Sequence, residues 1–197
     1  PRDLHSFPTR RSSDLNLRKG MVIYFRDVPH EVLDANHRTP GKGQAVVQTL
    51  LRNLRTQKTT QQRFNSTESV DVAVTERTKV EYSYSDGSGF HFMDPETYET
   101  ITLNDEMVGD AKQFLTENLA VMLLKVDGTI MGIDLPSTVD LKVTVSAEGL
   151  KGDSASNVQK PATVETGLTL NVPLFIKEGD VITINTTTGE YMGRSNS

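Results

Sequence analysis

The sequence predicts an all-β chain folded into small barrels, and three observations lead to this fold class. Short apolar or alternating runs recur at intervals of roughly ten residues, which is typical of sandwiches and barrels. Turn signals such as Asp86-Gly87 and Asp127-Gly128 separate these runs. The hydrophobic fraction of 36%, even with 14 glycines added, stays slightly below the globular norm, as several small barrels with much surface would.

The apolar runs predict strands in chain order. They lie at 21–25, 31–35, 44–54, 78–103, 120–136 and 140–191, with turns inside the longer ones. The longest irregular stretch, 148–163, is either a functional loop on a rigid barrel or a flexible connector.

One segment, 104–115, has the periodicity of a helix. Its apolar residues Met107, Ala111, Phe114 and Leu115 stand at i, i+4, i+7 and i+8, and Asn104 precedes them as a cap. We expect one short amphipathic helix here.

Residues 1–15 differ from the rest of the chain. They have no initiator Met and no apolar period, and they are biased toward Ser, Arg and Pro. They resemble translated adapter-like read-through, or else they form a native disordered tail, so we expect them to lie outside the fold.

The charge is unevenly distributed. Residues 16–63 carry nine Lys and Arg against three acids, whereas residues 64–197 carry nine against 21. The basic charge of residues 16–63 suggests a polyanion partner that faces this part of the chain. Judged on charge alone, an ordinary solvated surface is an equally good explanation. The strongly acidic central part has no contact assigned to it.

Several classes of site are excluded or disfavoured. The absence of Cys excludes disulfides, Cys-ligated zinc and thiol nucleophiles, and no histidine has metal-ligand spacing. We expect His91 on the strand side opposite Phe90 and Phe92, and His30 and His37 on the polar surface. No conventional catalytic constellation appears, so we expect no catalytic residues and no metal. No apolar stretch is long enough to span a bilayer, so we expect a soluble cytoplasmic protein.

The segment "TPGKGQA" predicts a hairpin tip with an exposed cation. Pro40 fixes its backbone φ, Gly41 and Gly43 relieve steric limits on either side, and Lys42 stands at the apex. An ordinary turn with a solubilising lysine is the alternative.

Four segments in order, "LRKGMVIYF", "PGKGQAVVQTLLRNLRT", "GLKGDSASNVQKPATVETG" and "VPLFIKEGDVITINTTTGEYMGR", resemble bacterial elongation factor P. The resemblance covers residues 16–197. It implies a KOW/SH3-like barrel at 16–78 and two OB-folds at 79–142 and 143–197, arranged in an L shape like a transfer RNA.

The resemblance implies a translation factor without enzymatic activity or cofactor. Such a factor binds the ribosome between the P and E sites and relieves stalling at consecutive prolines by stabilising P-site transfer RNA. Lys42 matches the tip residue that reaches the CCA end of P-site transfer RNA. In some relatives a lysine-modifying enzyme extends this residue. The resemblance leaves open whether Lys42 carries a lysyl group, an aminopentanol group or no modification. We expect a monomer that does not bind membranes.

The resemblance also implies a surface facing the E-site codon. Its residues match the segment from Gly152 and Asp153 to Lys160, Pro161, Ala162 and Thr163. Tyr191 and Arg194 match residues near transfer RNA and the small subunit, although Tyr191 could simply pack the final strand and Lys160 could be a solvated charge. Two other functions stay open: a paralogue of the factor, and a general OB protein for single-stranded nucleic acid.

Overall fold

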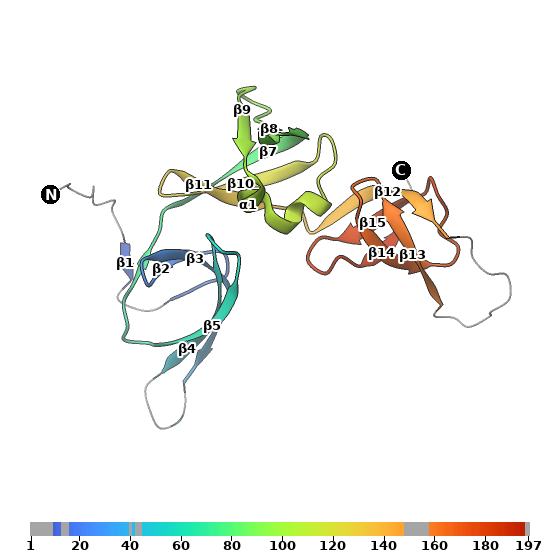
Figure 1. Cartoon of the computed structure of the whole chain (residues 1–197). Helices are drawn as coiled ribbons and strands as arrows, with labels where there is room; N and C mark the ends of the chain where they lie inside the picture. The colour runs from blue at the N-terminus through green and yellow to red at the C-terminus, as the bar shows by residue number, and fades with distance from the viewer. Residues whose placement is uncertain (1–9, 13–15, 40, 42–44, 148–157, 196–197) are drawn as a thin grey trace. The chain divides into compact units, whose positions relative to one another are not determined.

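The computed structural model describes residues 10–12, 16–39, 41, 45–147 and 158–195 (Figure 1). The chain divides into two compact units, residues 1–78 with 123–132 and residues 79–122 with 133–197. Three curled antiparallel sheets account for most of the described residues, which confirms the all-β prediction. No helix among these residues is long and apolar enough to cross a membrane. The domain boundaries and the L shape stay predictions.

The first sheet has the strand order β1-β6-β2-β3-β4-β5. Its strands are β1 (Arg10–Ser12), β2 (Val22–Phe25), β3 (Val28–Arg38), β4 (Val46–Asn53), β5 (Thr59–Asn65) and β6 (Val70–Val72). Alternating side chains turn inward to form one apolar core, which includes Ile23, Val32, Leu51 and Phe64.

Strand β1 lies inside the segment that we expected to remain outside the fold. Arg10–Ser12 pairs antiparallel with Val70–Val72 of β6. The backbone N–H and C=O groups of a strand edge can pair with any extended segment, so this contact needs no apolar pattern in the added strand. For these three residues the expectation was wrong.

The second sheet has the order β11-β10-β7-β8-β9. Its strands are β7 (Thr75–Asp86), β8 (Gly89–Met93), β9 (Thr100–Leu103), β10 (Ala120–Val126) and β11 (Thr129–Asp134). The turn between β10 and β11 packs in the first unit, where Leu124 and Val126 join a buried cluster with Val22 and Leu54.

Polar contacts add to this cluster at the β10–β11 turn. The Tyr24 hydroxyl donates to Asp127 Oδ2 over 2.5 Å, and the Val74 N–H donates to Asp127 Oδ1 over 2.9 Å. The Asp127 N–H in turn donates to the Val74 carbonyl over 2.8 Å. Asp127 therefore holds the turn against β2 and the start of β7.

The predicted helix is confirmed at its start but is shorter than expected. Asn104 caps α1 (Asp105–Val108) by accepting from the Met107 N–H over 2.9 Å. Gly109 has a φ of 54° and ends the α-helix, and residues 109–113 continue as a 3-10 helix. Of the predicted apolar face, Phe114 and Leu115 are buried and Met107 and Ala111 are half-buried, whereas the buried residue of α1 is Val108. The periodicity also missed this glycine break.

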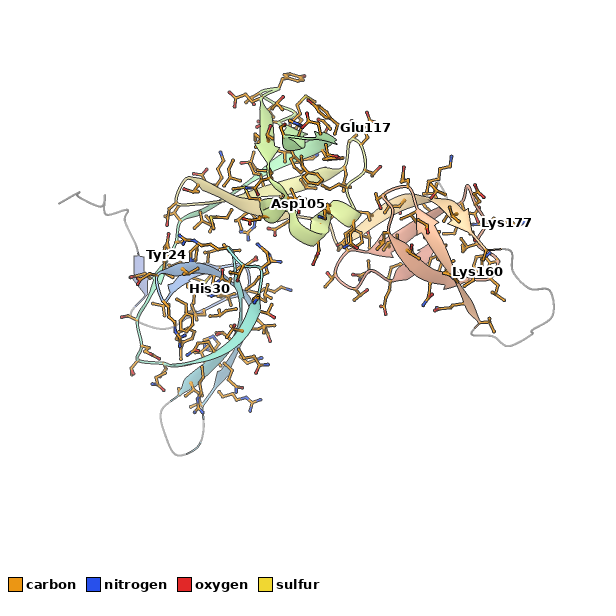
Figure 2. The ribbon with its side chains drawn as sticks, in the orientation of Figure 1. Tyr24, His30, Asp105, Glu117, Lys160 and Lys177 are labelled. Atoms are coloured by element: carbon orange, nitrogen blue, oxygen red, sulfur yellow. The ribbon has the colours of Figure 1, made fainter. Side chains whose placement is uncertain are left out.

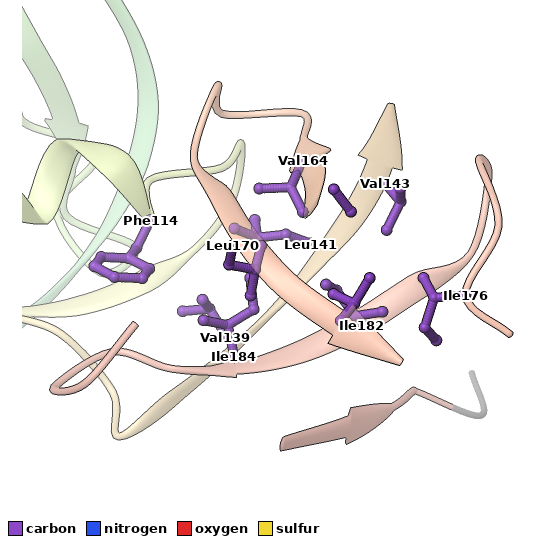
Figure 3. Close-up of a cluster of buried hydrophobic side chains, with 11 residues drawn as sticks. Phe114, Val139, Leu141, Val143, Val164, Leu170, Ile176, Ile182 and Ile184 are labelled. Atoms are coloured by element: carbon purple, nitrogen blue, oxygen red, sulfur yellow. The ribbon is translucent and has the colours of Figure 1, made fainter. Parts of the chain in front are cut away.

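The third sheet has the order β14-β13-β12-β15-β16. Its strands are β12 (Thr138–Ser146), β13 (Gln159–Val164), β14 (Thr169–Pro173), β15 (Val181–Asn185) and β16 (Tyr191–Arg194). Figure 3 shows the core that these strands enclose, to which the neighbouring strands β12 and β15 contribute the cross-strand pairs Val139–Ile184 and Leu141–Ile182. Phe114, which directly follows the 3-10 helix, also packs in this core.

Candidate functional site

The predicted tip belongs to the hairpin of β3 and β4. Cross-strand pairs run without a break from Asp34↔Leu50 to Arg38↔Val46, so two paired arms carry the connecting residues. Pro40, Lys42 and Gly43 lie outside the described residues. Gly41 is described and exposed, its φ lies outside the left-handed region, and an added Cβ would meet no described atom within 4 Å. The described fold therefore does not itself require glycine at position 41.

The sheet that carries this hairpin has a basic surface. Within the described part of residues 16–63, the exposed Lys and Arg side chains are Arg18, Lys19, Arg26, Arg38, Arg55, Lys58 and Arg63. Of the three acids in residues 16–63, Glu31 is buried and forms ion pairs with Arg52 and Arg77, the latter at 3.3 Å. Its charge is thus neutralised inside the fold, and the exposed charge is mainly positive.

A polar groove of about 330 Å³ lies on the outer face of β3, β4 and β5. Its lining consists of Asp34, Asn36, Gln48, Thr49, Leu50, Gln61, Gln62 and Arg63. The register places Asn36, Gln48 and Arg63 in one row across the three strands. No residue of this groove was predicted as a site from the sequence, although polar residues alternate with core residues along all three strands.

Lys160 is the most surprising of the predicted contact residues. It is 8% exposed, and its ammonium donates a hydrogen bond of 2.7 Å to the Ala147 carbonyl (Figure 2). Along β13 it occupies the same inward positions as Ala162 and Val164. The alternative of a solvated charge is therefore wrong, because the stem of Lys160 is buried and its head group joins the ends of β12 and β13.

The remaining residues of the same motif differ in exposure. Pro161 is exposed, Ala162 is 2% exposed, and the Thr163 hydroxyl lies 3.0 Å from that of Thr169. Gly152 and Asp153 lie outside the described residues. Among Lys160, Pro161, Ala162 and Thr163, only Pro161 is exposed.

Tyr191 and Arg194 both lie on the edge strand β16. Tyr191 pairs with Ile184 and Arg194 with Ile182, and a shift in register lies between these pairs. Ile182 and Ile184 point to the same face of β15, and directly paired residues share a face. The bulge adds one residue to β16, so Tyr191 and Arg194 point to the same side although they are three residues apart. Tyr191 packs against the core, whereas Arg194 is exposed.

The histidines follow the predictions in part. His91 lies opposite Phe90 and Phe92 as expected, but His30 is 7% exposed and its Nδ1 lies 2.8 Å from the Val28 carbonyl. The prediction of a surface position for His30 was wrong, because Phe25 packs edge-on against its ring at 5.6 Å. Among the described residues, no group of three or more His, Asp or Glu could hold a metal ion.

Comparisons with known proteins place these features in one family. Three family models match in order: the elongation factor P KOW-like domain over residues 15–70, the OB domain over 75–133 and the C-terminal domain over 139–194. Proteins named elongation factor P from Clostridium botulinum strains Eklund 17B and Alaska E43 are each 45% identical over 179 residues, covering 91% of this chain and 97% of theirs.

Two solved structures are also similar. Eukaryotic translation initiation factor 5A from Methanococcus jannaschii has 22% identity and a TM-score of 0.48, and covers 64% of this chain and 95% of its own. A translation initiation factor 5A family protein from Naegleria fowleri has 18% identity and a TM-score of 0.46, with coverages of 64% and 99%. These distant likenesses carry no conclusion about function. The three family models and the relatives at 45% identity show that the chain belongs to the elongation factor P family, whose members are translation factors and not enzymes.

Proposed function

We propose that the protein binds the ribosome between the P and E sites and stimulates peptide-bond formation at consecutive prolines by stabilising P-site transfer RNA. The observation that carries the proposal is the match to all three elongation factor P models along residues 15–194. Proline is a poor nucleophile and its ring restricts the nascent chain, so correct positioning is what the reaction lacks. A cytoplasmic monomer suits this role.

Lys42 is the residue that we propose reaches the CCA end of P-site transfer RNA. Two features support this role. The β3–β4 hairpin carries the tip on a mainly basic sheet, and phosphate groups favour clustered cations. An added Cβ at Gly41 would meet no described atom within 4 Å, so packing within the described fold does not explain the glycine. A residue without a side chain lets the backbone approach a partner closely. A lysine-modifying enzyme acting on Lys42 completes the proposal.

On the C-terminal domain, the proposed codon-facing residues divide into contacts and supports. Pro161, Thr163 and Arg194 are the proposed contacts among the described residues, together with Gly152 and Asp153. Lys160 and Ala162 support these contacts from inside the domain, because both residues are buried and the Lys160 ammonium already donates a hydrogen bond to the Ala147 carbonyl. Tyr191 packs on the core and so helps to hold β16, the strand that carries Arg194.

The proposal is tested first by co-sedimentation. The purified chain is centrifuged with ribosomes that hold P-site transfer RNA and an empty E site, and in parallel its binding to free single-stranded oligonucleotides is measured. Saturable pelleting with ribosomes and no comparable oligonucleotide binding is the expected result. Oligonucleotide binding without pelleting would instead support a general single-strand-binding OB protein. Intact-mass measurement of the native protein would identify any group on Lys42.

A further inference from the structure

Tyr84 on β7 has an exposed aromatic ring, one face of which stacks on the ring of His91. Its residue is 54% exposed, whereas His91 beneath it is only 7% exposed. The two rings stack with centroids 4.4 Å apart and planes 25° apart. One face of the Tyr84 ring is therefore covered, and the ring remains substantially open to solvent.

The histidine under this ring is fixed at both nitrogens. Thr102 Oγ1 lies 3.0 Å from Nδ1, Asp86 Oδ1 lies 3.0 Å from Nε2, and Ser88 Oγ lies 3.3 Å from Nε2. Ser88 also donates to Asp86 Oδ1 from its hydroxyl over 2.6 Å and from its N–H over 2.8 Å. We name Tyr84 with its support, His91, Asp86, Ser88 and Thr102, the tyrosine platform. Because it is preorganised, little conformational entropy is lost when a partner stacks on it.

Negative charge surrounds the tyrosine platform. Tyr84 and His91 form one cross-strand pair, and Glu81 pairs with Met93 two residues further along β8, so Glu81 lies on the same face. Hydrogen bonds from Ser88, and then His91, hold the pKa of Asp86 below its usual range, so this carboxylate is charged at neutral pH. Residues 79–112 carry two lysines, Lys79 and Lys112, of which Lys112 pairs with Asp105 at 2.9 Å. The same stretch carries eight acids: Glu81, Asp86, Asp94, Glu96, Glu99, Asp105, Glu106 and Asp110.

This combination selects among the possible occupants of an exposed ring. A nucleic acid could stack a base on Tyr84, but its phosphates would meet mainly carboxylates, because residues 79–112 carry eight acids against two lysines and one of these, Lys112, already pairs with Asp105. A cationic side chain is attracted both by the ring face and by the carboxylates. The planar guanidinium of Arg suits such a site better than Lys, since it stacks on a ring while donating to a carboxylate.

We infer that the tyrosine platform binds an arginine-containing, basic segment of a protein partner, with the guanidinium stacked on Tyr84 and paired with Glu81 or Asp86. This surface belongs to the second unit, whereas the β3–β4 hairpin belongs to the first. The inference does not depend on the function proposed for Lys42. It gives the acidic central segment a role that the sequence left unassigned.

The test titrates the full-length, isotope-labelled chain with a short arginine-glycine repeat peptide and follows backbone amide signals by NMR. A lysine-glycine peptide of equal charge and an oligouridylate serve as competing probes. We expect saturable shifts at residues 81–91 with the arginine peptide, weaker shifts with the lysine peptide and none there with the oligouridylate. Equal or stronger shifts with the oligouridylate would overturn the inference in favour of a nucleobase site.

Matched variants separate stacking from general attraction. Tyr84→Phe keeps the ring and should bind the arginine peptide within about twofold of the unchanged chain, whereas Tyr84→Leu should bind about three- to tenfold more weakly. Glu81→Gln should weaken binding, whereas Glu178→Gln, which removes an exposed acid from the connection between β14 and β15, should not. Thermal unfolding checks that each variant folds. If Tyr84→Leu does not fold, the single variants Tyr84→Phe and Glu81→Gln still test the inference.

Two further outcomes would contradict the inference. If Tyr84→Leu binds the arginine peptide as tightly as Tyr84→Phe, attraction to the acids alone explains the binding. If the chain forms a dimer in sedimentation that Tyr84→Leu abolishes, the occupant is a second copy, whose residues 16–63 are basic, and not a separate partner.

Discussion

Replacing Tyr24 by Phe removes a single hydroxyl and with it the 2.5 Å hydrogen bond to Asp127 Oδ2. Asp127 keeps its two hydrogen bonds to the backbone of Val74, so the turn remains in place but is less firmly held. A hydrogen bond to a charged group contributes about 1.5–3 kcal/mol. Because the Tyr24 residue is only half-buried and water can replace part of this bond, we expect a loss of about 1–1.5 kcal/mol.

Native-state hydrogen exchange measures this loss at the turn itself. The amides of Val74 and Asp127 should exchange about five- to tenfold faster in the Tyr24→Phe chain, if both open by releasing the turn. Tyr98→Phe is the matched control, since Tyr98 is 74% exposed and its hydroxyl should have little effect. Unchanged exchange at both amides in the Tyr24→Phe chain would refute the reasoning.

The same contact predicts a pH dependence. Burial, followed by the hydrogen bond and charge of Asp127, raises the pKa of Tyr24 to about 12. Since the pKa of an unfolded tyrosine is about 10, the stabilisation is complete below pH 10 and is lost as the pH rises from 10 to 12. Urea unfolding should show a difference between the unchanged and Tyr24→Phe chains that is constant from pH 7 to 9 and shrinks toward pH 12. A difference that persists undiminished at pH 12 would contradict this account.

The remaining predictions concern packing at three positions. Gly41→Ala should change the free energy of unfolding by less than about 0.5 kcal/mol, because its Cβ meets no described atom within 4 Å. Gly89→Ala should cost more than about 2 kcal/mol, because φ is 140° and the Cβ would lie 2.4 Å from the Leu103 carbonyl oxygen. Leu141→Ala should cost about 3 kcal/mol through a cavity in a fully buried site. Urea denaturation checks all three, and similar costs at Gly41 and Gly89 would contradict the first two.

The sequence predicted the parts of the fold that depend on local pattern. Alternation of apolar residues gave the strands, and the Asp127-Gly128 signal gave a hairpin turn, which the structure places between β10 and β11. Asn104 marked the start of the helix, because capping depends on residues within one turn. These features are determined by neighbours in the chain, so they could be recognised without tertiary information.

Contacts between distant residues could not be predicted in this way. Tyr24 and Asp127 stand 103 residues apart, and nothing in either local pattern indicates their hydrogen bond. His30 lies at a buried position because Phe25 and the Val28 carbonyl surround it, whereas its local sequence reads as polar. Lys160 shares its inward alternation with Ala162 and Val164, a signal that could have been noticed. Its charge concealed that pattern, because a long stem can be buried while its ammonium reaches a carbonyl.

The central claim is that Lys42 acts at ribosomes stalled on consecutive prolines, and a paired translation reporter tests it most directly. The chain is expressed in a bacterial strain whose own elongation factor P gene is deleted, and read-through of a diproline reporter is divided by that of a reporter without prolines. The account predicts that the unchanged chain and Lys58→Ala, which removes another exposed cation of residues 16–63, restore this ratio, whereas Lys42→Ala does not. Equal restoration by Lys42→Ala, at equal protein level, would contradict the claim.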